Sequence, residues 1–181
     1  EQEEEELFEI DEEPIDFEKL KNEIDYLKRC RDLAKSIPIE SKAKALIEAF
    51  DNGFVKMKEF GALPKALVFT ESRRTQIYLK NYLSQLGINV VTYNGTNNDD
   101  DAKEIYRKWL LIHEGTPIVT GNPLIDRKQA LLDYFKNNAQ VMIATEAGAE
   151  GINLQFCSLL INYDLPWNPQ RVEQRIGRCH R

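Results

Sequence analysis

An amide and two guanidinium groups recur at helical spacing near the end of the chain. Gln174, Arg178 and Arg181 are spaced i, i+4 and i+7, so a helix through residues 170–181 presents all three on one face. Guanidinium groups suit phosphate because they stay charged and donate two parallel hydrogen bonds. The pattern favours a phosphate-binding face, although a solvated basic helix is the plainer interpretation of an isolated arginine-rich segment.

Polar segments follow four short apolar runs earlier in the chain. They read Thr-Glu-Ser-Arg-Arg at 70–74, Asn-Gly-Thr at 94–96, Thr-Glu-Ala-Gly-Ala-Glu-Gly-Ile-Asn-Leu at 145–154 and Tyr-Asp-Leu-Pro-Trp-Asn-Pro at 163–169. Asn168 and Pro169 start the final helix well, because asparagine caps a first turn and proline suits the first helical position.

The apolar runs predict the strands that position these segments. We expect strands at residues 66–70, 89–93, 141–145 and 159–163, with a short fifth at 117–120. Continuous rather than alternating apolar strands, separated by helices, indicate a parallel sheet covered on both faces. The predicted fold class is therefore α/β, a doubly wound parallel sheet flanked by helices. Such sheets bind ligands beyond the carboxyl ends of their strands.

Two helices are expected before the sheet. Asp16 is a suitable cap for a helix that runs to about Ile37. Ser41 caps a second helix, which the turn residues Asn52 and Gly53 are expected to end. These helices form an N-terminal extension of the sheet domain.

The net charge of −6 hides an asymmetry along the chain. Residues 1–13 carry nine carboxylates and no basic residue, which leaves a net charge of +3 over the other 168 residues. We expect residues 1–15 to be an acidic disordered tail, residues 16–62 a helical lead-in and residues 63–181 the sheet domain. The acidity of the whole chain therefore does not exclude nucleic-acid binding by the folded part.

Cysteine usage and hydropathy exclude several classes of protein. The three cysteines form no Cys-x-x-Cys pair, which is typical of a reduced, intracellular protein. No apolar run approaches the roughly 20 residues that a membrane-spanning helix needs. Cys157, Cys179 and His180 lack metal-ligand spacing, so we predict no metal site. We expect a cytoplasmic protein that acts as a monomer and has no membrane partner.

Taken in order, the polar segments resemble motifs of superfamily 2 helicases. Residues 66–74 are similar to motif IV, residues 145–154 to motif V and the end of the chain to motif VI. The combination of Gly-Ile-Asn-Leu, Trp-Asn-Pro and Gln-Arg-Ile-Gly-Arg-Cys-His-Arg resembles the SWI/SNF-type branch in particular. Members of that branch are ATP-driven translocases on double-stranded DNA, and many are bacterial. Nucleoid association is therefore expected if the source is bacterial.

The resemblance implies one lobe of a two-lobe motor. Such helicases hold ATP between two RecA-like lobes, and the first lobe carries a Gly-x-x-x-x-Gly-Lys-Ser/Thr phosphate loop and an acidic magnesium-binding strand. This chain contains no Gly-Lys dipeptide. It resembles the C-terminal RecA-like lobe, truncated at Arg181 and partnered by the N-terminal lobe of the same protein. ATP and Mg²⁺ would act in the intact protein, and we predict that this chain alone binds neither and is inactive.

The resemblance also implies roles for individual residues. Arg178 and Arg181 would be arginine fingers at the γ-phosphate, which can raise the rate by about 10³ to 10⁵. Gln174, Gly151 and Asn153 would bind the nucleotide. Contacts to the DNA backbone would come from Ser72, Arg73, Gly95, Thr96, Thr145 and Trp167, with Arg74 a candidate of the same kind. Trp167 is expected either near the DNA or packed against the sheet.

Three other functions stay open at this point. The chain is also compatible with a superfamily 2 lobe that acts on RNA or unwinds duplexes, although Gly-Ile-Asn-Leu and Trp-Asn-Pro argue against this function. A non-catalytic interaction module on the same fold is a second alternative, because fold alone does not establish activity. The retained pair of finger arginines speaks against it. An unrelated nucleotide-binding α/β protein is the third.

Overall fold

The computed structural model describes residues 16–37, 40–149 and 151–179. They divide into two units, with the boundary between Glu40 and Ser41. The acidic segment 1–15, predicted to be a disordered tail, lies outside the described residues. Each unit is described by itself.

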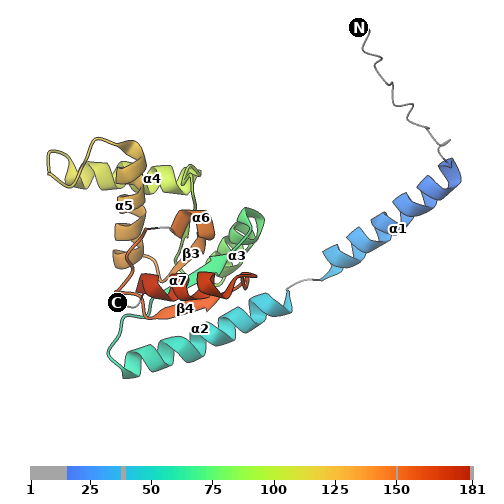
Figure 1. Cartoon of the computed structure of the whole chain (residues 1–181), viewed down its shortest axis with the longest axis horizontal. Coiled ribbons are helices and arrows are strands. Elements are labelled where there is room, and N and C mark those ends of the chain that lie inside the picture. The colour runs from blue at the N-terminus through green and yellow to red at the C-terminus, as the bar shows by residue number, and fades with distance from the viewer. Residues whose placement is uncertain (1–15, 38–39, 150, 180–181) are drawn as a thin grey trace, which may run out of the picture. The chain divides into compact units, whose positions relative to one another are not determined.

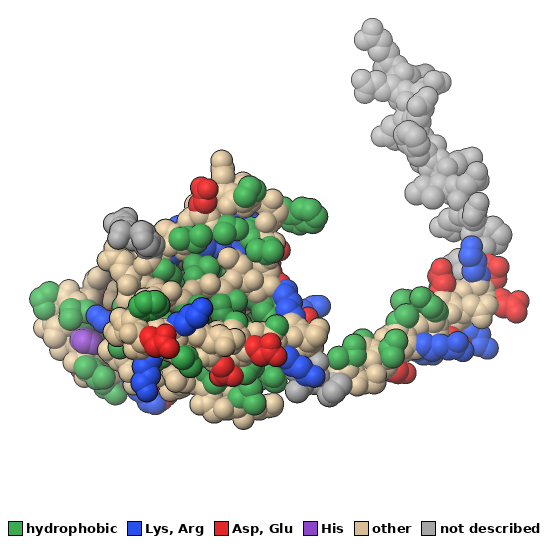
Figure 2. Space-filling model, turned by 90° about the horizontal axis from the view of Figure 1, so that it is seen from below, with side chains coloured by type: hydrophobic (Ala, Val, Ile, Leu, Met, Phe, Trp, Pro, Cys, Tyr) green, Lys and Arg blue, Asp and Glu red, His purple; other side chains and the backbone are tan. Residues whose placement is uncertain are grey.

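The first unit is a single helix, α1 (Phe17–Ser36). Asp16 caps it as predicted, because its carboxylate accepts hydrogen bonds of 3.1 Å from the backbone N–H groups of Glu18 and Lys19. No residue of α1 is buried. Figure 2 shows hydrophobic side chains along one side of this helix and charged side chains along the other.

The second unit contains the sheet and the remaining helices (Figure 1). In chain order its elements are α2 (Ser41–Glu59), β1 (Ala66–Thr70), α3 (Arg73–Gln85), β2 (Val90–Tyr93), α4 (Asp100–His113), α5 (Pro123–Asn137), β3 (Val141–Thr145), α6 (Glu146–Ala149), β4 (Leu159–Asn162) and α7 (Pro169–Cys179). The four long apolar runs are strands, as the sequence predicts.

The four strands of the described residues form one parallel sheet in the order β2-β3-β1-β4. From β1 the chain crosses to the β2 edge, and from β2 it returns to β3. These two crossovers run in opposite directions across the sheet. Because crossovers between parallel strands are right-handed, α3 therefore lies on one face of the sheet, and α4 and α5 lie on the other. The predicted doubly wound α/β fold is confirmed.

Burial on both faces explains the continuous apolar strands. Every residue of β1 and β3 is buried, whereas the residues of the edge strand β4 are only half-buried. The core between the sheet and α5 contains Leu67, Phe69, Tyr93, Leu131, Phe135, Met142 and Leu154. Strands covered on both faces need no polar alternation.

Two details of the prediction are wrong. The second helix does not end at Asn52 and Gly53 but continues to Glu59. A Cβ atom at Gly53 would lie 2.6 Å from Cδ2 of Leu159, so glycine lets β4 pack closely against the helix instead of ending it. Tertiary packing here outweighs the low helix propensity of glycine.

The predicted fifth strand at 117–120 does not form. Thr120 instead donates hydrogen bonds from its backbone nitrogen (2.9 Å) and its hydroxyl (2.7 Å) to the buried Asp126 carboxylate, and Gly121 N–H donates a third of 3.1 Å. These bonds satisfy the N–H groups of Thr120 and Gly121 just before α5, so these two groups need no strand partner.

Lys65 supports the other end of α5. Its ammonium group is buried and donates to the carbonyl oxygens of Phe135 (2.8 Å), in the last turn of that helix, and of Ala139 (2.6 Å), two residues beyond its end. The last carbonyls of a helix have no partner within the helix, so this lysine satisfies a need that the sequence pattern did not reveal.

We expect Lys65→Met to lower the free energy of unfolding by about 2 kcal/mol, because two carbonyl oxygens lose a charged donor. Urea unfolding of the chain, followed by circular dichroism, measures the change. Lys136→Met, which replaces an exposed lysine on the same helix, is the control and should change the free energy by less than about 0.5 kcal/mol. Equal midpoints for wild type and Lys65→Met would contradict the capping role.

Candidate functional site

The carboxyl ends of the four strands lie at one edge of the sheet. Thr70 at the end of β1 is paired in register with Thr145 at the end of β3, and Phe69 with Asn162 at the end of β4. The segments that follow the strands are therefore neighbours in space, although they are far apart in sequence. This edge is where parallel sheets of this kind bind their ligands.

The segment after β1 begins helix α3 and is joined to the segment after β2. Ser72 caps α3, because its hydroxyl accepts a hydrogen bond of 3.1 Å from Arg74 N–H. Arg73 is exposed, and its guanidinium lies 3.5 Å from the hydroxyl oxygen of Thr96. The structure thus brings Ser72, Arg73 and Thr96 together, as the sequence predicts for one surface.

Two asparagines that sequence reasoning missed shape the segment after β2. The side-chain oxygen of Asn94 accepts hydrogen bonds from Thr96 N–H (3.2 Å), the Thr96 hydroxyl (3.1 Å) and Asn97 N–H (2.8 Å). Asn97 returns the interaction by accepting from Asn94 N–H at 2.7 Å, and its φ of 46° is in the left-handed region that asparagine tolerates. This closed loop leaves Gly95 and Thr96 exposed.

Gly148 lets the segment after β3 approach this loop. A Cβ atom at position 148 would lie only 2.6 Å from Cα of Asn94, so any side chain there would push the two segments apart. Thr145, just before, is 7% exposed. Of the predicted DNA contacts, Thr145 therefore offers little surface, and Gly95 and Thr96 offer more.

Helix α7 carries the predicted phosphate-binding face. Asn168 caps it, accepting from Gln170 N–H at 3.0 Å, and Pro169 is its first residue, as predicted. Gln174 is exposed and Arg178 is half-buried. Arg181 lies outside the described residues, so the structure places only one of the two proposed fingers.

A backbone hydrogen bond joins the end of α7 to the segment after β3. Leu154 N–H donates to the carbonyl oxygen of Arg178 at 2.8 Å. Gly151 and Asn153, the other predicted nucleotide-binding residues, are exposed just before Leu154. The structure therefore brings this segment next to Arg178.

Arg175 is a buried arginine that links several segments of the edge, and sequence reasoning did not single it out. It is 3% exposed. Its guanidinium donates to Glu146 Oε2 (2.6 Å), Asn162 Oδ1 (2.7 Å) and the carbonyl oxygen of Asp164 (3.0 Å). Its Cζ atom also lies 4.7 Å from the centroid of the Phe69 ring. One side chain thus contacts residues at the ends of three strands. The sequence alone does not distinguish the buried arginine from the half-buried Arg178 three residues later.

Asp164 links the same edge to helix α2. Its carboxylate accepts from Lys42 Nζ (2.7 Å), from the Thr70 hydroxyl (2.6 Å) and from Glu71 N–H (3.1 Å). Burial raises the pKa of Asp164, but the hydrogen bonds from Lys42, Thr70 and Glu71 outweigh burial and hold this pKa below its usual range.

Trp167 is fully exposed, at 101% of its reference area. Of the two placements that the sequence left open, packing against the sheet is therefore wrong. The short loop between β4 and α7 holds this indole in water, where it can reach a ligand or another domain.

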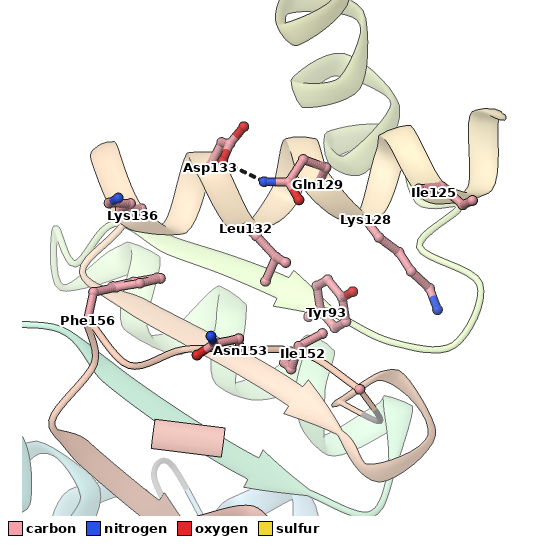
Figure 3. Close-up of a pocket in the computed structure, with 11 residues that line it drawn as sticks. Tyr93, Ile125, Lys128, Gln129, Leu132, Asp133, Lys136, Ile152, Asn153 and Phe156 are labelled. Carbon is pink, nitrogen blue, oxygen red and sulfur yellow. Dashed lines mark hydrogen bonds between the residues drawn. The ribbon is translucent and has the colours of Figure 1, made fainter. Parts of the chain in front are cut away.

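A groove of about 570 Å³ runs between α5 and residues 151–156 (Figure 3). Leu132, Ile152 and Phe156 form an apolar floor, with Lys128 near the middle of the helix and Lys136 near its C-terminal end. The Tyr93 hydroxyl is buried, with no hydrogen-bond partner among the described residues. Burial raises the pKa of Tyr93 to about 12, so the phenol is neutral at physiological pH.

The site offers hydrogen-bond donors for an anion. Gln174 and Arg178 supply amide and guanidinium groups suited to the phosphates of ATP. Among the described residues there is no group of three His, Cys, Asp or Glu side chains that could hold a metal ion.

The fold and this edge define a class of protein. Residues 41–181 match the helicase conserved C-terminal domain, and the chain belongs to this family. Its architecture is the RecA-like C-terminal lobe of a superfamily 2 helicase, as the motifs predict. A solved structure, the C-terminal part of the Fun30 ATPase domain, shares the fold with a TM-score of 0.54 at 21% identity, over 92% of this chain and 46% of that one.

Particular relatives carry helicase names. The uncharacterized ATP-dependent helicase YqhH of Bacillus subtilis (strain 168) is 46% identical over 117 residues, which are 65% of this chain and 16% of that protein. The RNA polymerase-associated protein RapA of Serratia proteamaculans (strain 568) is 44% identical over 71 residues, 39% of this chain and 7% of RapA. The chain thus spans a small part of these relatives. No helix among its described residues is long and apolar enough to cross a membrane.

We expect Asp164→Asn to lower the stability of the chain at pH 7 and to flatten its loss of stability in acid. A carboxylate whose pKa is lowered by folding stabilises the protein above the unfolded pKa of about 4, and this contribution is lost as pH falls through the folded pKa. The variant and wild type should therefore converge toward pH 3.

Thermal unfolding at pH 7 and pH 3 measures this difference. Asp25→Asn, which replaces an exposed carboxylate on α1, is the matched control and should behave as wild type at both values. A gap between wild type and Asp164→Asn that stays constant with pH would refute the role of the ionised carboxylate.

Proposed function

We propose that this chain is the second motor lobe of an ATP-dependent DNA translocase of the SWI/SNF type. The observation that carries the proposal is the 2.8 Å hydrogen bond from Leu154 N–H to the Arg178 carbonyl. It joins the C-terminal end of α7 to the segment that follows β3, and Arg73 and Thr96 are exposed in the segments that follow β1 and β2. The groups proposed to bind a nucleotide and a nucleic-acid backbone thus come from segments that follow the strands of one parallel sheet.

On the nucleotide side, Arg178 and Arg181 act as fingers for ATP held mainly by the N-terminal lobe of the intact protein. Phosphoryl transfer develops charge on the γ-phosphate oxygens, and a guanidinium placed there stabilises the transition state. Gln174, Gly151 and Asn153 contact the nucleotide. The phosphate loop and the magnesium ligands belong to the other lobe, so this chain alone hydrolyses no ATP.

On the nucleic-acid side, the exposed groups suit phosphates rather than base edges. Arg73, Thr96 and the backbone at Gly95 contact the DNA backbone, as a translocase that moves along any sequence requires. Ser72 sets the direction of α3, and Thr145, which is 7% exposed, shapes the edge more than it contacts DNA. Trp167 and Arg74 add contacts from the rim. The net charge of +3 beyond residue 13 supports an anionic partner.

The whole protein would be a monomeric ATPase in the cytoplasm, associated with the nucleoid if bacterial. The helicase names of relatives support ATP use. Gly-Ile-Asn-Leu at 151–154 and Trp-Asn-Pro at 167–169 support the SWI/SNF branch and double-stranded DNA.

ATP turnover by the full-length protein and by this chain tests the proposal. We expect turnover that double-stranded DNA stimulates in the full-length protein, and none in the chain alone. Stimulation by RNA in place of DNA would favour an RNA helicase lobe. No turnover under any condition would favour a non-catalytic interaction module on the same fold.

We expect Arg178→Ala in the full-length protein to lower DNA-stimulated ATP turnover by at least about tenfold with near-normal DNA binding, because the arginine acts on the transition state. Steady-state ATPase assays and DNA titrations measure the two quantities. Arg107→Ala, which removes an exposed arginine paired with Glu104 on α4, is the control and should match wild type. Unchanged ATP turnover in Arg178→Ala would contradict the assignment of Arg178 as an arginine finger.

A further inference from the structure

We propose that Arg175 is a positioning residue that couples the DNA-facing segments to the arginine face of α7. This inference rests on the proposed function and adds a route by which DNA binding reaches the nucleotide. The residue contacts no ligand itself, because it is 3% exposed. Its role follows from what its guanidinium holds.

Toward the DNA side, Arg175 holds the segments that follow β3 and β4. Its ion pair of 2.6 Å is with Glu146, the residue directly after Thr145. It also donates to the carbonyl oxygen of Asp164 at 3.0 Å. The Asp164 carboxylate in turn accepts from Thr70 and Glu71, directly before Ser72. A shift in either DNA-facing segment therefore changes the environment of one buried guanidinium.

Toward the nucleotide side, Arg175 fixes the rotation of α7. Arg178 lies three residues later on the same helix, so an anchor at Arg175 sets the direction in which Arg178 projects. The bond from Leu154 N–H to the Arg178 carbonyl fixes the far end. Displacement of a catalytic group by on the order of 1 Å can cost about 10²-fold in rate, so a small rotation of α7 is sufficient to control turnover.

The charge itself, rather than packing alone, makes this contact sensitive. A buried ion pair is a poor source of stability, and apolar replacements of similar volume are often tolerated. Its geometry is strict, however, because the planar guanidinium donates to three acceptors and also lies over the Phe69 ring. An apolar side chain can fill the space without transmitting the position of Glu146.

The test separates coupling from folding by removing the charges and keeping the volume. Three variants of the full-length protein are required: Glu146→Gln, Arg175→Met and the double variant. Arg171→Met is the matched control, because Arg171 lies 3.7 Å from the same Glu146 carboxylate but is 54% exposed. The measured quantity is the Kd for double-stranded DNA with and without a non-hydrolysable ATP analogue, together with the thermal midpoint.

We expect the ATP analogue to change the wild-type DNA Kd by at least about fivefold, a typical coupling between two sites. In all three variants this ratio should fall below about twofold, while the Kd without nucleotide stays within about threefold of wild type. The double variant should lose no more coupling than the worse single variant, because both remove one interaction. Arg171→Met should keep the wild-type ratio.

Three results would overturn the coupling role. They are a wild-type ratio near one, a wild-type ratio retained in Arg175→Met and Glu146→Gln, or a loss of DNA affinity without nucleotide as large as the loss with it. The last result would indicate a structural role only. Failure of the proposed function appears separately, as an absence of DNA-stimulated ATP turnover in the wild-type protein.

Discussion

The structure depends on the burial of β1 between two parallel neighbours. Ala66 to Thr70 are all buried, and the strand pairs in register with β3 on one side and β4 on the other. Because the side chains must pack on both faces, the register cannot slip without exposing the core. The same constraint places four strand ends at one level, so residues separated by up to about a hundred positions meet at one edge.

At that edge, charge is organised in two linked clusters. The Asp164 carboxylate accepts hydrogen bonds from Lys42 of α2 and Thr70 of β1, and the Asp164 backbone carbonyl accepts one from Arg175. The Arg175 guanidinium donates hydrogen bonds to Glu146 and Asn162. Arg175 is buried and Asp164 is half-buried, while Arg73, Thr96 and Gln174 are exposed. The arrangement separates the groups that hold the edge in shape from those available to a ligand.

Sequence patterns were sufficient for the strands, the helix caps Asp16 and Asn168, and the edge, because these follow from local periodicity and short-range chemistry. Ser41, expected to cap the second helix, is instead its first residue. The patterns failed where tertiary contacts decide. Gly53 was expected to end a helix, but the helix continues through it, and the absence of a side chain at Gly53 lets Leu159 pack against the helix. Residues 117–120 looked like a strand, but the N–H groups of Thr120 and of the next residue, Gly121, donate to Asp126 instead of to a neighbouring strand. Arg175 and Arg178 are alike in sequence, and only the fold shows that Arg175 is buried.

The chain contains two tryptophans, and their surroundings are opposite. Trp109 is 5% exposed and donates from its indole nitrogen to Asp133 at 2.7 Å, whereas Trp167 lies wholly in water. Their fluorescence therefore reports on different events. Emission from Trp109 follows the integrity of the packing between α4 and α5. Emission from Trp167 follows whatever approaches the carboxyl edge of the sheet, so this lobe carries its own optical probe of docking beside an internal reference for folding.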